Sequence, residues 1–266
     1  MAPFPGRLKA GGRRATVHTM LKLVRAGVAA ACLLGALVIA SCAVNQTLVI
    51  ADDGSGSLAT HAEVSPLLRD YLASLADLSG NPGPLKEGRV FDAEAIRKDF
   101  QSRPGIVVQK AATPTPASLD LELGFDSLQD IVRTQDALTN AGAFVIVDAG
   151  DRRTLRLHLD RATYGQLASL FPLLRDPVLS QLGPQGTGQV TEADYLSMIR
   201  FSIGDDAPRL LKKSFIILTV QPQGEIISQS GGTLNGNSVV FRIPVLRVVV
   251  LDRPLDYSVT FRIPQS

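Results

Sequence analysis

The chain has 266 residues, 45% of them hydrophobic, and a formal net charge of +2. The first 41 residues hold six of its 27 Lys and Arg side chains and none of its 25 acids, so the rest is acidic, with 21 cations against 25 anions. This excludes the basic stripe of a nucleic-acid-binding domain. Two cysteines, Cys32 and Cys42, are too few for a disulfide framework.

An apolar stretch over residues 26–40 follows the cationic start of the chain. It is about fifteen residues long, whereas a bilayer-spanning helix needs about twenty. Small residues close it, as a processing site requires. The pattern predicts a signal peptide over residues 1–41 rather than an anchor helix, with Met1 and Met20 both suitable as the translation start.

Ile39, Ala40, Ser41 and Cys42 resemble the lipobox of bacterial lipoproteins, in which an aliphatic and two small residues precede a cysteine. The resemblance implies cleavage between Ser41 and Cys42, a diacylglyceryl group on the Cys42 thiol and an acyl chain, such as palmitate, on the new amino terminus. Two or more acyl chains hold a protein stably on a bilayer. The expected location is therefore the bacterial cell envelope, on the inner or the outer membrane, with the membrane as partner.

Strand and helix signals begin soon after Cys42. Strands are expected at 47–50 and 57–64 around an acidic Gly/Ser turn. Ser65 and Pro66 open a helix that runs to Gly80, and Asp92 caps a second helix over 93–101. Paired strands are expected at 105–110 and 119–125.

The middle of the chain alternates between the two element types. A helix is expected from Asp126 or Ser127 to Asn140, then strands at 144–147 and 154–159. A leucine-rich helix follows over 164–174. Thr191 begins a capped helix, and 206–213 form a short one.

From residue 215 onward almost all of the sequence has a strand pattern, at 215–220, 225–228, 238–250 and 257–263. Asn235 and Gly236 give a strong hairpin signal. The whole predicts an α+β fold: a mainly antiparallel sheet packed against several amphipathic helices. Residues 42–266 are expected to form a single mature domain, with 105–125 as the place where a subdivision would fall.

Segments 218–228 and 232–241 resemble the LppM-like lipoproteins. In that family a strand ends in a Pro/Gly turn, here Pro222 and Gly224, and a second strand leads through an Asn-Gly turn to a third. The layout after Cys42 is also similar, although Phe241 stands where members usually have Trp. The resemblance implies a non-enzymatic envelope lipoprotein with an apolar ligand cavity, and lipid or glycolipid as its ligand.

Catalytic and metal-binding motifs are missing from the sequence. The two histidines after Cys42, His61 and His158, lie in expected strands without an H-E-x-x-H pattern. There is no nucleophile elbow and no phosphate-binding Gly loop. We therefore predict no catalytic residue, no metal and no cofactor.

The sequence contains one cluster of arginines and two pairs of acids. Arg152, Arg153, Arg156 and Arg161 could meet anionic headgroups, or could guard a solvated strand edge. The acid pairs 52–53 and 205–206 are typical of turns and caps. Two functions then fit the sequence: an envelope lipoprotein that binds a lipid or acts as an interaction module, or an envelope hydrolase with a dispersed active site.

Overall fold

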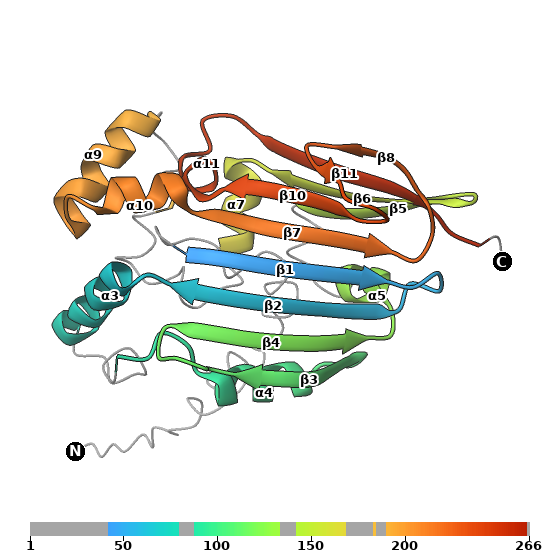
Figure 1. Ribbon diagram of the computed structural model, residues 1–266, viewed down its shortest axis with the longest axis horizontal. Coiled ribbons are helices and arrows are strands. Elements are labelled where there is room, and N and C mark those ends of the chain that lie inside the picture. Colours follow the sequence, from blue (N-terminus) through green and yellow to red (C-terminus); the bar gives the residue numbers. More distant parts are fainter. Residues whose placement is uncertain (1–41, 80–87, 134–141, 169–182, 185–189, 265–266) are drawn as a thin grey trace, which may run out of the picture.

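The computed structural model describes residues 42–79, 88–133, 142–168, 183–184 and 190–264 (Figure 1). The predicted signal peptide and the ends of two predicted helices, to Asn140 and to Leu174, lie outside these residues. Within them the strands form two sheets, one of seven strands and one of four.

The larger sheet combines both ends of the described chain. Its strands, in spatial order, are β3 (Ile106–Ala112), β4 (Ser118–Phe125), β2 (Gly56–Val64), β1 (Cys42–Ile50), β7 (Phe215–Pro222), β10 (Val239–Pro244) and β9 (Thr233–Leu234). All neighbours are antiparallel except β1 and β7, which run parallel with Val44 opposite Ile216. The segment 105–125 forms the β3–β4 hairpin, which continues this sheet beyond β2.

In the sequence, the strands of the smaller sheet are interspersed among those of the larger sheet. It consists of β5 (Phe144–Ala149), β6 (Arg152–Leu159), β11 (Leu255–Arg262) and β8 (Ile226–Ser230), all antiparallel. The rings of Phe241 on β10 and Tyr257 on β11 pack edge to face with centroids 5.7 Å apart, which joins the two sheets.

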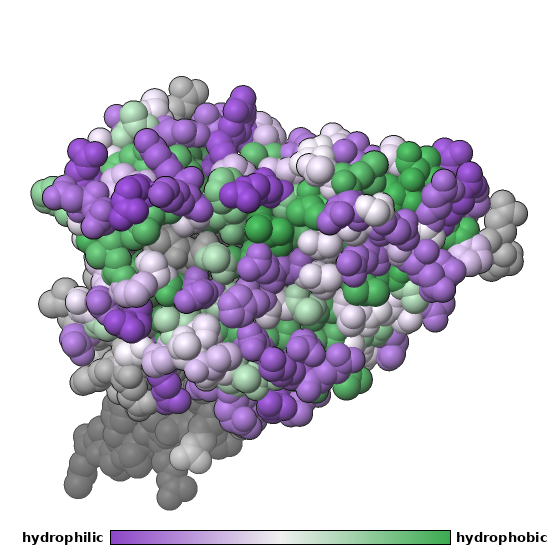
Figure 2. All heavy atoms as spheres, in the orientation of Figure 1, coloured by the Kyte–Doolittle hydropathy of each residue, from purple (hydrophilic) through white to green (hydrophobic). Residues whose placement is uncertain are grey.

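Buried and exposed side chains alternate along the strands of the larger sheet, so the sheet has one buried and one solvent-exposed face. On β1, Val44, Leu48 and Ile50 are buried, whereas Asn45 and Val49 are exposed. In Figure 1 helices α5 (Leu128–Arg133) and α7 (Arg161–Ala168) lie behind the sheet. Figure 2 shows the molecule from the front, where hydrophilic and hydrophobic side chains mix over the strands.

The other helices gather mostly at the edges and at one end of the larger sheet (Figure 1). They are α3 (Pro66–Ser79), α4 (Ala93–Gln101), α9 (Glu192–Ile203), α10 (Ala207–Lys213) and α11 (Val245–Val250). The predicted caps are confirmed: Asp92 accepts from two backbone N–H groups of α4, Thr191 from Asp194, and Ser65 from Leu68.

The predicted strand over 238–250 is wrong in its second half. β10 ends at Pro244, and the next six residues form α11, five of them buried. A run buried on all sides shows neither helical nor strand periodicity, and its valines favoured a strand. Pro244, at φ −66°, starts the helix, and Leu251, at φ 44°, ends it in the left-handed region.

The α+β class and the mainly antiparallel pairing are confirmed. The leucine-rich helix begins earlier than predicted, at Arg161 rather than Tyr164, because Asp160 caps it. The Asn235–Ser238 turn is also confirmed, with reciprocal backbone hydrogen bonds between these two residues.

Candidate functional site

A groove of about 770 Å³ opens where three chain segments meet. The segments are the start of α7, the start of α9 and the loop between α11 and β11. Its lining residues are Asp160, Arg161, Ala162, Val190, Thr191, Glu192, Ala193, Leu251, Asp252, Arg253 and Pro254. Ligand pockets usually have this volume, and here the walls are mixed, with charged side chains next to small apolar ones.

Asp160 and Thr163 fix the α7 wall of the groove. The Asp160 carboxylate accepts from the Thr163 N–H at 2.7 Å, and the Thr163 hydroxyl accepts from the Asp160 N–H at 2.7 Å. This reciprocal pair satisfies two backbone donors at the helix start. Arg161 donates from Nε to the Leu251 carbonyl at 3.2 Å, which ties α7 to the end of α11.

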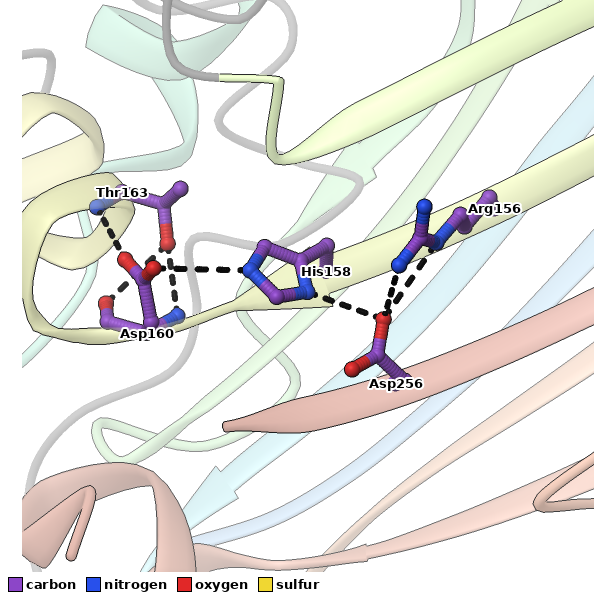
Figure 3. A network of polar contacts seen from close by, with 5 residues as sticks. All are labelled: Arg156, His158, Asp160, Thr163 and Asp256. Atoms are coloured by element: carbon purple, nitrogen blue, oxygen red, sulfur yellow. Dashed lines mark hydrogen bonds and ion pairs between the residues drawn. The ribbon is translucent and has the colours of Figure 1, made fainter. Parts of the chain in front are cut away.

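Figure 3 shows a histidine held between two carboxylates, one of which, Asp160, lines the groove. His158 Nδ1 lies 2.8 Å from Asp256 Oδ1, and Nε2 lies 3.4 Å from Asp160 Oδ2. Arg156 donates to the same Asp256 oxygen at 2.7 Å. The cluster therefore joins β6, β11 and the start of α7.

The surroundings favour the charged forms of His158, Asp160 and Asp256. The hydrogen bond to Asp256 raises the pKa of His158, against a smaller effect of burial. Hydrogen bonds from Arg156 and then His158 lower the pKa of Asp256, and the Thr163 N–H lowers that of Asp160. The imidazole is thus stabilised as an imidazolium that donates from both nitrogens.

This arrangement does not resemble a nucleophilic active site. A general base needs one ring nitrogen directed at the hydroxyl or thiol that it activates, but both nitrogens of His158 face carboxylates. His61 Nδ1 lies 2.7 Å from Asp120 Oδ1, and Asp120 also accepts from Lys110. Among the residues described, no hydrogen bond joins either imidazole to a serine, threonine or cysteine side chain, and no group of three metal-ligating side chains occurs.

Replacing His158 should change stability only over a defined pH range. A raised folded-state pKa gives stabilisation that is fully present below the unfolded pKa, about 6.5, and is lost as pH rises through the folded value. Near pH 6 we expect His158→Gln to cost about 0.5–1 kcal/mol, as for a partly exposed pair, and near pH 9 almost nothing. Urea unfolding at both pH values measures this, and an equal loss at both would contradict the assignment.

The structure describes one of the two predicted processing residues. Ser41 lies outside the described residues, and Cys42 is the first residue of β1, paired with Val64 of β2. Within the described ranges, no helix is long and apolar enough to cross a membrane.

The predicted arginine cluster does not form a single patch. Arg153 is buried and binds Asp148 through Nε and Nη2 at 2.7 and 2.9 Å, and Arg156 binds Asp256. Their strand, β6, pairs on both sides, with β5 and β11, so the interpretation as a guarded strand edge is wrong. Asp53 accepts from Ser55 within its turn, and Asp206 precedes α10, as predicted for the acid pairs.

The expected apolar cavity has a small counterpart among the described residues. Between the sheet and α5, Leu58, Leu123, Phe125, Leu128 and Ile131 are among the residues around a space of about 20 Å³, which is little more than one water. The leucine-rich helices α3 and α7 are described only in part. An apolar ligand stays a prediction.

Sequence reasoning missed the groove because its parts are far apart in the chain. The one local signal was the Asp160 to Thr163 spacing of a helix cap. Nothing local places the loop at 252–254 beside it.

Comparison with known proteins gives a structural similarity but no family. No family model matches the chain, and no curated protein matches it. Among solved structures, it is similar to the folded domain of LppM from Mycobacterium tuberculosis, determined by NMR. The TM-score is 0.41 and the identity 12%, over 86% of this chain and 95% of that one. Membership of the LppM-like family stays a prediction.

Proposed function

We propose that this protein is an envelope lipoprotein, held on a membrane by lipid on Cys42, whose folded domain binds a ligand rather than catalyses a reaction. The observation that supports it is the position of Cys42. The residue that ends the lipobox is also the first residue of β1. Cleavage there would leave the whole described fold, from β1 to β11, directly attached to its anchor.

The groove is the proposed ligand site, and its walls favour the polar headgroup of an envelope lipid or glycolipid. Arg253 is exposed and forms no ion pair with any residue that the structure describes. The groove also carries the carboxylates of Glu192 and Asp252, which can accept hydrogen bonds from the hydroxyl groups of a sugar or glycerol. Ala162, Ala193 and Pro254 are exposed and offer apolar surface for the carbon framework of a sugar or glycerol.

Mass spectrometry of the protein extracted from bacterial membranes tests both parts. We expect a mature chain that begins with acylated Cys42, and a copurified lipid in the native spectrum. Cys42→Ala should leave an uncleaved precursor. Arg253→Glu should keep the acylated terminus but lose the copurified lipid.

The two parts of the proposal fail separately. An unmodified amino terminus at Met1 or Ala43 would exclude the anchor. Equal lipid retention by the native chain and Arg253→Glu, or none in either, would exclude the groove as the headgroup site. Lys98→Glu is the matched charge reversal away from the groove, on α4, and should retain the lipid.

A further inference from the structure

The end of the molecule that carries Cys42 also carries α3, α9 and α10 (Figure 1). The topology explains why. β1 starts at this end, the antiparallel β2 finishes there and leads into α3, and the parallel β7 starts there directly after α10. Helix α9 packs against α10 and α3. We call these three helices and the start of β1 the anchor end.

Phe201 on α9 is the most exposed large hydrophobic residue of the described chain. Its exposed fraction is 95%, against 62% for the next, Val107. Tyr195 and Ile199 bury the other side of α9, so Phe201 points away from the core. An aromatic ring in water contributes nothing to folding, but it is a common anchor at a bilayer interface.

The last turns of α9 and α10 both carry cations. Arg200 lies in the last turn of α9, and Lys212 and Lys213 lie in the last turn of α10. All three are exposed, and none forms an ion pair within the described ranges. Arg209 pairs with Asp206, so across residues 200–213 the four cations outnumber the two acids. The chain after residue 41, in contrast, has 21 cations against 25 acids.

We propose that residues 200–213 of the anchor end are a membrane-docking surface, in which Phe201 enters the interface of an anionic bilayer and Arg200, Lys212 and Lys213 bind its phosphate groups. The proposal rests on the lipid anchor at Cys42. Because β1 begins at Cys42, only that side chain and its glyceryl group separate the acyl chains from the fold. The helices beside β1 must then reach the headgroup layer, where each cation favours an anionic surface.

The chain allows a direct test because it has no tryptophan, and its mature form has one thiol. A mature chain that begins at Cys42 can be coupled to maleimide lipid in phosphatidylglycerol vesicles, which replaces the natural acylation. Phe201→Trp places a reporter on α9. Val147→Trp, at a 51% exposed position on β5 at the other end of the molecule, is its control (Figure 1).

On coupling, we expect the Phe201→Trp emission to shift to the blue and brominated lipids to quench it, while Val147→Trp stays unchanged. Neutralising Lys212 and Lys213 to Gln should lower the docked population about fivefold per lysine. Vesicles of phosphatidylcholine alone should give at least this loss, because they also lack the anionic partner of Arg200.

Docking is excluded if Phe201→Trp is as accessible to aqueous quencher after coupling as before, or if both reporters change equally. An unacylated Cys42 in cells would instead exclude the natural anchor and leave the vesicle result standing, so the two proposals fail separately.

Discussion

Gly56→Ala should lower the free energy of unfolding by about 3 kcal/mol or more, the range of a core substitution that forces a backbone shift. Gly56 is the first residue of β2. A Cβ there would lie 2.0 Å from the Val49 carbonyl oxygen and 2.8 Å from the Phe125 ring. The carbonyl belongs to β1 and cannot rotate away, because β1 pairs on both sides.

The measurement is urea or thermal unfolding, with an expected fall in Tm of about 6–12 °C for a domain of this size. Gly165→Ala is the matched control. Gly165 lies in α7, with nothing within 4 Å of an added Cβ. There the substitution should stabilise by about 0.5–1 kcal/mol, because alanine favours the helix. Similar values for both variants would contradict the close packing at the β1–β2 turn.

Short-range signals predicted much of this fold because the interactions behind them are short-range. Asp92 and Thr191 cap helices through hydrogen bonds to residues two or three positions away. Asn235 and Gly236 lie in a four-residue turn that joins the two strands of a hairpin. Such contacts depend on side-chain type and spacing alone, so the sequence is enough to locate them.

Pairing between distant segments had no comparable signal. β1 and β7 lie side by side although residues 51–214 separate them, and alternation of apolar residues does not say which strands become neighbours. The division into two sheets follows from such pairings. The groove depends on them too, because β6 and β11 must pair before Asp160 and Arg253 can meet.

The buried valines of α11 show a different limit. Val248 and Val249 favour a strand by their branched side chains, yet they lie in a helix. Burial of five of the six side chains outweighs an intrinsic preference of a few tenths of a kcal/mol per residue.

Two phenylalanines with opposite surroundings give the last prediction. Phe261 on β11 is 1% exposed, between β6 and β8, and belongs to the hydrophobic core. Phe261→Ala should cost about 3–5 kcal/mol, because the lost ring leaves a cavity that the paired strands cannot close. Phe201→Ala removes the same atoms from a 95% exposed position and should change stability by less than about 0.5 kcal/mol.

Chemical unfolding of the two variants separates folding from docking. If Phe201→Ala unfolded as readily as Phe261→Ala, the outward direction of Phe201 would be wrong, and the docking surface with it. A native-like unfolding curve for Phe201→Ala, with weaker attachment of the coupled chain to anionic vesicles, is the expected result, because nothing in the fold needs that ring and the proposed membrane contact does.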